Sequence, residues 1–264
     1  MLMKQENMKV IEQKTLAPNI FEMTLEGEMV QEMLVPGQFL HCQPPNRSDL
    51  LLRRPISISS IDLDNRQCKL IYRAEGAGTV AMSQLSANQS LDVLGPLGNG
   101  FPVEDISEGE LVIVIGGGIG IPPLYEVAKQ AVLRGAKVIA FLGFASKEVM
   151  FYLEEFQALG DVHVSTDDGS YGTKGHLGLV LDEVLPLIEP SAVYSCGPTP
   201  LLAKVDQYFE EHPRAYVSLE ERMACGVGAC AACVCQTKDK KTKRMKLKKV
   251  CDEGPVFATG VVNI

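Results

Sequence analysis

The sequence of 264 residues contains no tryptophan, few aromatic residues and no long hydrophobic run. Its most apolar stretch, residues 111–124, is interrupted by four glycines and is too short to span a bilayer. The first seven residues hold no apolar run like that of a signal peptide. We therefore expect a cytoplasmic protein with no membrane association.

An excess of positive charge is also lacking, since the net charge is −8 and the isoelectric point is near 5.1. This balance argues against a protein that coats DNA or RNA. The mixture of 46% hydrophobic and 22% charged residues excludes wholesale disorder. The charge is uneven, because residues 238–249 carry eight Lys or Arg and one Asp. We interpret this basic run as a solvated hairpin or loop, with a docking surface for an acidic partner as the alternative.

The eight cysteines are too clustered for a disulfide scaffold. Cys225, Cys230 and Cys233 have the spacing C-x4-C-x2-C, and Cys251 follows at a distance. This is the ligand spacing of a plant-type 2Fe–2S cluster. Thiolates suit iron, and the Gly and Ala residues between them allow backbone N–H groups to approach the sulfurs. A zinc site is the alternative, although such sites usually show two C-x2-C pairs.

The remaining cysteines fall outside this spacing. Cys235 lies two residues beyond the third expected ligand, and we interpret it as a spare thiol. Cys42, Cys68 and Cys196 are interpreted as ordinary core residues. The four histidines are scattered, and we interpret them as surface residues or as core residues with satisfied hydrogen bonds.

The first hundred residues alternate short segments of β type with turns rich in Gly, Pro, Asn and Asp. The six expected strands cover residues 10–16, 20–25, 38–42, 54–59, 68–73 and 90–95. Strands at this spacing predict a small antiparallel β-barrel, and the polar residues 103–110 mark its boundary.

After residue 110 the pattern alternates between strands and helices. The expected strands cover residues 111–115, 137–142, 162–166, 192–196 and 215–219, and the expected helices cover residues 122–134, 147–159, 177–187 and 198–211. This alternation predicts a doubly wound α/β domain with a parallel sheet. The last fifty residues have few apolar runs, so we expect them to need a metal centre to fold. The predicted domains are residues 1–104, 105–218 and 219–264.

Four glycines, Gly116, Gly117, Gly118 and Gly120, follow the first buried strand of this domain. Glycines there allow the backbone to approach a pyrophosphate, and the N-terminus of the next helix favours its charge. The usual G-x-G-x-x-G is not met, and no Asp, Glu or Arg after the second strand selects NAD or NADP. A turn without a ligand in a generic α/β domain is the alternative. We interpret residues 167–169 as a strand-end turn, with contact to the nucleotide as the alternative.

A second candidate site lies in the barrel. Arg54 is followed three residues later by Ser57 in an extended stretch, and such a pair can bind a pyrophosphate from one side. Residues 71–73 and the turn Gly76-Ala77-Gly78-Thr79 strengthen this interpretation, because the turn offers backbone N–H groups at the start of a helix.

The order of these motifs resembles that of the ferredoxin reductase family of flavoproteins over residues 1 to about 220. The segments LEERMACGVGACAAC (219–233) and VCDEGPVF (250–257) are similar to those of electron-transfer subunits of the dihydroorotate dehydrogenase B complex. With them, the resemblance covers the whole chain. The basic stretch before Cys251 departs from it as an enlarged loop, which leaves the partner surface open.

The resemblance implies one bound FAD, one 2Fe–2S cluster, and NAD as a dissociable substrate. The implied FAD-binding residues are Arg54, Pro55, Ile56, Ser57, Ile71, Tyr72, Arg73, Gly78 and Thr79. The implied nucleotide-facing residues are Gly116, Gly117, Gly118 and Gly120, with Cys196, Gly197 and Pro198 near the nicotinamide and flavin. The implied cluster ligands are Cys225, Cys230, Cys233 and Cys251.

A chain with these three carriers converts between hydride and one-electron chemistry, and its own residues need no acid–base catalyst. The resemblance implies that electrons come from the FMN of a separate dihydroorotate dehydrogenase catalytic subunit, in a heterotetramer with two copies of each subunit. They would pass through the cluster and FAD to NAD⁺, in pyrimidine (UMP) biosynthesis. The alternatives are another NAD(P)H-linked iron–sulfur flavoprotein reductase subunit, of ferredoxin or sulfide type, and a non-enzymatic redox sensor.

Overall fold

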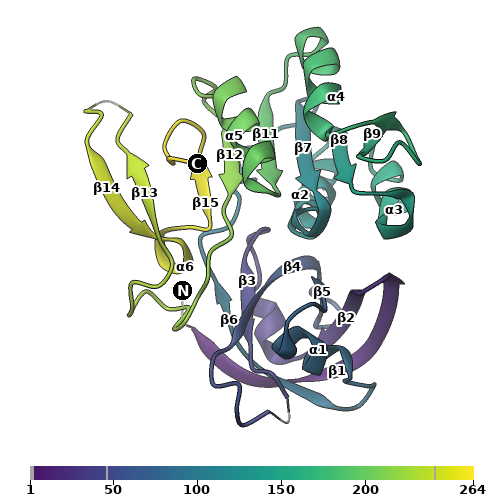
Figure 1. Ribbon diagram of the computed structural model, residues 1–264, viewed down its shortest axis with the longest axis vertical. Helices are drawn as coiled ribbons and strands as arrows, with labels where there is room; N and C mark the ends of the chain where they lie inside the picture. The colour runs from purple at the N-terminus through teal and green to yellow at the C-terminus, as the bar shows by residue number, and fades with distance from the viewer. Residues whose placement is uncertain (1–2, 46, 241) are drawn as a thin grey trace.

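The computed structural model describes residues 3–45, 47–240 and 242–264, with a β-barrel on one side of an α/β sheet (Figure 1). The barrel strands are β1 (Lys4–Ala17), β2 (Ile20–Glu26), β3 (Phe39–Cys42), β4 (Arg54–Asp62), β5 (Gln67–Arg73) and β6 (Ser90–Leu97). They close in the order β1-β2-β5-β4-β3-β6, with antiparallel pairing throughout. The predicted six-stranded barrel is confirmed.

The first strand begins earlier than predicted. It starts at Lys4 rather than at residue 10, because Lys4 to Lys9 pair with Gly95 to Ser90 of β6 and thereby close the barrel. This stretch is polar, so its strand character comes from a partner far away in the sequence rather than from an apolar pattern. Alternate side chains of β1, such as Met8 and Val10, point into a fully buried core.

The α/β part contains a seven-stranded sheet in the order β10-β9-β8-β7-β11-β12-β15. Its strands are β7 (Leu111–Gly117), β8 (Lys137–Phe144), β9 (Asp161–Thr166), β10 (Thr173–Lys174), β11 (Ala192–Cys196), β12 (Ala215–Ser218) and β15 (Val256–Ala258). All pairs are parallel except β12 with β15. The sequence order reverses between β7 and β11, which is where open α/β sheets bind ligands.

Helices cover both faces of this sheet. They are α2 (Pro122–Leu133), α3 (Leu153–Gln157), α4 (Leu177–Val184) and α5 (Thr199–Tyr208), with short 3₁₀ turns η2 (Gly118–Gly120), η3 (Lys147–Val149) and η4 (Leu185–Leu187). In β7, Val112 and Val114 pack with α2 and α3, whereas Ile113 and Ile115 pack with α4 and α5. Burial on both faces explains the continuous apolar run of this strand. None of the described helices is long and apolar enough to cross a membrane.

The prediction of one helix over residues 147–159 is wrong. The chain forms η3 and then α3, and between them Tyr152 adopts a left-handed conformation with φ 60°. Its hydroxyl group donates a hydrogen bond to the buried carboxylate of Glu22 in β2. This contact with the barrel determines the local backbone against the helical pattern. On the adjacent helix α2, Glu126 accepts a hydrogen bond of 3.0 Å from the backbone N–H of Ile61 in β4.

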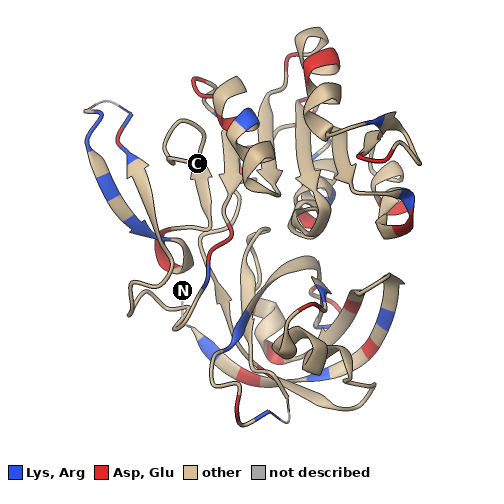
Figure 2. Cartoon of the chain, in the orientation of Figure 1, with Lys and Arg blue, Asp and Glu red and all other residues tan. Residues whose placement is uncertain are grey.

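The C-terminal region contains the hairpin of β13 (Val234–Lys238) and β14 (Met245–Lys249), then α6 (Val250–Glu253) and β15. The hairpin interpretation of the basic run is confirmed, and Figure 2 shows its lysines and arginines in blue. Lys241, part of that run, lies outside the described residues. Val250, Cys251 and Phe257 share one apolar cluster with the α4 and α5 face of the sheet. β15 and the small strand β10 were not predicted.

Candidate functional site

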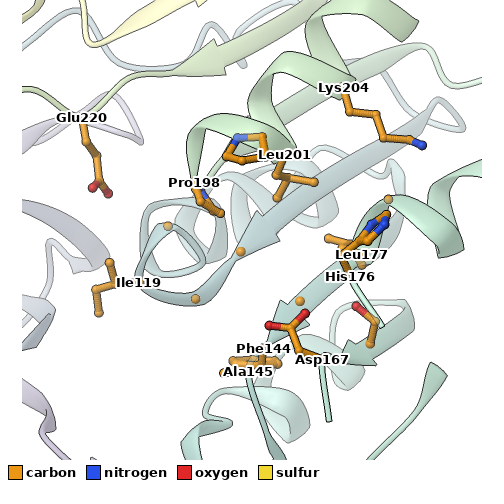
Figure 3. Close-up of a pocket in the computed structure, with 18 of the residues that line it drawn as sticks. Ile119, Phe144, Ala145, Asp167, His176, Leu177, Pro198, Leu201, Lys204 and Glu220 are labelled. Carbon is orange, nitrogen blue, oxygen red and sulfur yellow. The ribbon is translucent and has the colours of Figure 1, made fainter. Parts of the chain in front are cut away.

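A cavity of about 620 Å³ opens at the carboxyl ends of β7, β8, β9 and β11 (Figure 3). Gly117, Gly118 and Gly120 line it, and Gly197 and Pro198 of the β11–α5 turn lie beside them. The structure therefore brings the two predicted nucleotide motifs together at one site. Gly116 lies one residue earlier in β7 and is not part of this lining.

The glycine loop and the β11–α5 turn are pressed against one another. A methyl group added to Gly120 would lie 2.5 Å from the backbone nitrogen of Gly197 and 2.6 Å from the carbonyl carbon of Cys196. Backbone atoms cannot move aside as a flexible side chain can, so only glycine fits at residue 120. The helix start that lines the cavity is that of α5, with Pro198 and Pro200, whereas the first residues of α2 are buried behind the glycine loop.

Ser165 and Lys204 also line the cavity, although the sequence did not indicate either of them. Ser165 in β9 has a buried hydroxyl oxygen that finds no hydrogen-bond partner among the residues that the structure describes. Lys204 of α5 forms an ion pair of 2.6 Å with Asp182 at the rim. In Figure 3, Asp167 lies beside Phe144 and Ala145. The expected strand-end turn at residues 167–169 is present, so an acidic group follows the third strand of the domain rather than the second.

A second cavity of about 250 Å³ lies between the barrel and the sheet. Its lining includes Pro55, Ile56 and Ser57 of β4, Ile71, Tyr72 and Arg73 of β5, and Cys196 of β11. It meets the first cavity at Arg73, Ile119 and Glu220, which line both. Two predicted sites from separate parts of the chain therefore adjoin.

Three predicted FAD-binding residues, Arg54, Gly78 and Thr79, lie outside the second cavity but close to one another. The Arg54 side chain lies over Gly78, where an added methyl group would be 2.6 Å from its Nε atom. Thr79 is in the first turn of α1 (Ala77–Ser83), and its hydroxyl group donates a hydrogen bond of 3.1 Å to the Gly76 carbonyl oxygen. The R-P-I-S strand and the small-residue turn thus form one surface.

Burial raises the pKa of three ionisable groups that line the second cavity. Burial raises the pKa of the Tyr72 phenol, whose oxygen accepts a hydrogen bond of 2.7 Å from Gln13. Burial also raises the pKa of the Cys196 thiol. Glu220 is reached by solvent through the cavity but is enclosed by protein on most sides. This desolvation raises the pKa of its carboxyl group, and Arg73 opposes the shift.

The four predicted cluster cysteines are gathered in two pairs. The sulfur atoms of Cys233 and Cys251 are 3.2 Å apart, and the thiol of Cys230 lies within hydrogen-bond reach of the Cys225 sulfur. Within the described ranges, no three His, Cys, Asp or Glu side chains gather in an arrangement that could hold a metal ion. A 2Fe–2S cluster has two irons and four thiolates, whereas zinc needs its ligands around one ion. The donor set and its pairing therefore fit the cluster.

Backbone N–H groups point at these sulfurs. The Cys225 sulfur accepts from Val227 at 3.5 Å and from Cys230 at 3.3 Å, and the Cys251 sulfur accepts from Gly228 at 3.3 Å. The donors to Cys225 stabilise its thiolate and lower its pKa to about 6. Burial raises the pKa of Cys251 to about 12. The loop thus favours negative charge on the Cys225 sulfur, whereas burial opposes it at Cys251.

His41 of β3 lies between the barrel and the cysteine loop. It is fully buried, and its two ring nitrogens face the backbone of Arg53 and Cys225 without a hydrogen bond of good geometry. Burial, assisted by the Arg53 charge, lowers the pKa of His41 to about 4. The interpretation of the histidines as surface or satisfied core residues is therefore wrong for His41. In contrast, the His212 ring lies 3.0 Å from the carbonyl oxygen of Pro190.

Two protein-family models match the chain. One, described as the iron–sulfur cluster binding domain of dihydroorotate dehydrogenase B, matches residues 220–263. The other, an oxidoreductase NAD-binding domain, matches residues 114–207. Two similar proteins are named dihydroorotate dehydrogenase B (NAD(+)), electron transfer subunit. The protein from Enterococcus faecalis is 54% identical over 260 residues, 98% of each chain. That from Streptococcus pneumoniae is 51% identical over 261 residues, 99% of each chain.

Solved structures share the architecture. An NADH-dependent reduced ferredoxin-NADP oxidoreductase has a TM-score of 0.83 at 24% identity, over 98% of this chain and 90% of that chain. The ferredoxin-NADP⁺ reductase of Plasmodium falciparum has a TM-score of 0.65 at 16% identity, over 82% of this chain and 96% of that chain. At these identities the likeness shows the fold alone, a reductase-like barrel joined to an α/β sheet.

Proposed function

This chain belongs to the family of dihydroorotate dehydrogenase B electron transfer subunits, and we propose that it carries electrons from dihydroorotate oxidation in a partner subunit to NAD⁺. The family resemblance of the motifs is thereby confirmed. The observation that supports this function is that two predicted nucleotide sites meet at Arg73, Ile119 and Glu220. A paired set of four cysteines adjoins the barrel strand β3 at His41.

We propose that the second cavity binds the isoalloxazine end of FAD, which exchanges hydride or single electrons when bound. The residues that would hold it are those of β4 and β5 that line the cavity. Arg54 would neutralise the pyrophosphate, since its side chain lies on the Gly78 turn. Residues 1–104 would thus carry the flavin, residues 105–218 the nicotinamide nucleotide and residues 219–264 the cluster.

The first cavity is proposed to bind NAD, with its pyrophosphate on the glycine loop. Asp167 would accept hydrogen bonds from the ribose hydroxyl groups and would repel a 2′-phosphate, which favours NAD over NADP. Replacing Asp167 by Asn should lower the preference for NADH over NADPH by about tenfold. Asp168→Asn is the matched control, since the Asp168 carboxylate instead accepts from the Ser170 hydroxyl group at 2.6 Å. An unchanged preference in Asp167→Asn would exclude this role.

Cys225, Cys230, Cys233 and Cys251 would hold one 2Fe–2S cluster, one iron on each pair. Their loop supplies the N–H groups that stabilise charge on the sulfurs. Because the relatives are named electron transfer subunits, we assign dihydroorotate oxidation to a separate catalytic subunit containing FMN. We propose a heterotetramer of two copies of each subunit, working in the cytoplasm, where thiols stay reduced.

The docking surface for that subunit is proposed to include the outer strand of the basic hairpin. Met245 and Leu247 are 55% and 68% exposed there, and lysines flank them. Such a surface suits an acidic face with a small apolar centre. Binding should therefore weaken as the salt concentration rises.

The test uses the purified chain with its cofactors, alone and with the catalytic subunit. Under anaerobic conditions, NADH should bleach the flavin absorbance of the chain alone, and the chain alone should produce no orotate from dihydroorotate. Adding the catalytic subunit should couple dihydroorotate oxidation to NAD⁺ reduction. A colourless protein, or a flavin that NADH does not bleach, would overturn the proposal in favour of a redox sensor. Turnover of dihydroorotate by the single chain would overturn the division of labour.

A further inference from the structure

His41 connects the strand of the proposed flavin site to the cysteine loop. In the barrel, His41 of β3 lies opposite Pro55 of β4, and Pro55 lines the second cavity. On its other side, the ring packs on Gly226, where an added methyl group would lie 2.4 Å from Nδ1. One side chain therefore contacts the segment next to Cys225 and sits on the strand beside the flavin motif.

The hydrogen bonding of this ring is incomplete. His41 is fully buried, and neither ring nitrogen has a partner of good geometry among the described residues. A neutral imidazole always carries one N–H group and one acceptor nitrogen. A buried donor without an acceptor is costly, and most buried polar groups are paired. The ring nitrogens face the backbone of Arg53 and Cys225, so a small shift of the cysteine loop on binding its group would complete a hydrogen bond from the ring.

The contact is also close enough to set the position of the loop. Gly226 has φ 71° and is buried against the ring, so the chain between Cys225 and Val227 cannot move toward β3. Val227 is the residue whose N–H group points at the Cys225 sulfur. A smaller side chain at residue 41 would leave space into which this turn could relax.

We propose that His41 is a positioning residue for electron exchange between the flavin and the cluster, and that its ring N–H group donates a hydrogen bond to the cysteine loop when the cluster is bound. The inference rests on the proposed function and extends it to a residue outside both predicted ligand sets. Hydrogen bonds toward cluster sulfurs stabilise the reduced, more negative state. Removing the donor should therefore lower the reduction potential of the cluster and, when NADH supplies the electrons, slow the reduction of the cluster by the flavin.

The experiment compares His41→Leu, which removes the donor, with His41→Gln, which keeps an N–H donor. His163→Leu is the control, since His163 stacks on Phe141 in the sheet, with ring centroids 5.0 Å apart. Each purified protein with its cofactors is reduced stepwise, and the reduced cluster is followed by electron paramagnetic resonance. In His41→Leu the ratio of reduced to oxidised cluster at a fixed potential should fall about tenfold, which is about 59 mV for a one-electron couple. His41→Gln should recover most of this loss, and the control should match the unchanged protein.

A measurement without substitution complements the titration. With ¹⁵N-labelled histidine, pulsed paramagnetic resonance of the reduced cluster should detect a coupled ring nitrogen, and that coupling should vanish in His41→Gln. Absence of the coupling in the unchanged protein, or an unaltered cluster potential in His41→Leu, would overturn the proposal. Loss of the cluster from His41→Leu alone, with flavin retained, would support the positioning role.

Failure of the inference about His41 can be distinguished from failure of the proposed function. Bleaching of the flavin by NADH does not involve the cysteine loop, so it should be unchanged in both His41 variants. If NADH fails to bleach the flavin in the unchanged protein, the proposed function fails. If bleaching is normal and the reduction potential of the cluster is the same in the His41 variants as in the unchanged protein, only the inference about His41 fails.

Discussion

The cavities at the sheet and the cysteine loop hold their groups in different ways. The walls of the first cavity include backbone at the ends of β7 and β11, strands with fully buried interiors. The cysteine loop has little core around its first two ligands, because Cys225 and Cys230 are partly exposed. Its sulfurs are positioned mainly by N–H groups of the same loop. The fold thus shapes the nucleotide sites in advance, whereas the cysteine loop depends on the group that it binds.

The largest expected effect comes from replacing one of the four proposed cluster ligands. Cys251→Ser should abolish the cluster and reduce electron transfer between the two subunits by more than about 100-fold. This loss exceeds the loss of about 10- to 100-fold caused by replacing residues that only support the ligands of a metal site. Flavin reduction by NADH should remain, because the cavities at the sheet do not need the loop. Visible absorption, paramagnetic resonance and stopped-flow bleaching measure these three properties.

The matched control for this prediction is Cys235→Ser, a change of the thiol that lies in β13. It should keep the cluster spectrum and the electron-transfer rate. Loss of flavin reduction in Cys251→Ser would contradict the independence of the two regions. Loss of the cluster in Cys235→Ser would instead show that this thiol is a ligand.

A substitution in the glycine loop should affect the first cavity and leave the cysteine loop unchanged. Gly120→Ala places a methyl group against the backbone of Gly197, and such overpacking costs about 1–3 kcal/mol. We expect binding of NADH to weaken by about tenfold or more, with the cluster spectrum intact. Gly76→Ala is the control, because an added methyl group there has no neighbour within 4 Å. Equal losses in the two variants would argue against a preformed cavity.

The contact between the barrel and the sheet is tested by Tyr152→Phe. This change removes the hydroxyl group that donates to Glu22 and leaves a buried carboxylate with Lys69 at 3.1 Å as its remaining ion-pair partner. We expect the free energy of unfolding to fall by about 1–3 kcal/mol, measured by urea denaturation. Tyr208→Phe is the control, since Tyr208 is 44% exposed. A stability equal to that of the control would show that the hydrogen bond of Tyr152 adds nothing to the contact between the barrel and the sheet.

The smallest effect concerns an ion pair remote from both regions. Arg214 lies 2.6 Å from Glu110 and lowers the pKa of that carboxyl group. The ion pair therefore stabilises the fold fully above pH 4.5, the ordinary pKa of a glutamate carboxyl group. This stabilisation is lost as the pH falls through the lowered pKa of Glu110 in the folded protein. Glu110→Gln should cost about 0.2–1 kcal/mol at pH 7 and progressively less in acid. A stability difference that grows in acid would contradict this assignment.

Much of the architecture could be predicted because it depends on local patterns. The alternation of β1 and the apolar run of β7 follow from which faces are buried. The elements that escaped prediction depend on distant partners: β15 is three residues long and exists because β12 lies beside it. The break at Tyr152 likewise depends on Glu22, a residue of the barrel.

The site shows the same division. The spacing of Cys225, Cys230 and Cys233 is local, so the sequence alone was enough to predict a 2Fe–2S cluster there. His41 carries no such signal, because its neighbours at Gly226 and Cys225 come from the other end of the chain. Glu220 and Ser165 also matter only through the cavities that they line. The spacing of cysteines in the sequence can reveal ligands that share one loop, whereas contacts between distant segments are visible only in the three-dimensional structure.

The pairing of β12 with β15 has a consequence for variation along the chain. The polypeptide leaves the sheet after Ser218 and returns at Val256, which lies directly opposite, and the Leu219 N–H group bonds the Pro255 carbonyl oxygen at 3.0 Å. The intervening cysteine loop and hairpin therefore form an insertion whose two ends are fixed side by side. Doubling the length of such an excursion costs only about 0.6 kcal/mol in closure entropy. The basic hairpin can thus lengthen or shorten without disturbing the sheet that binds the nucleotide.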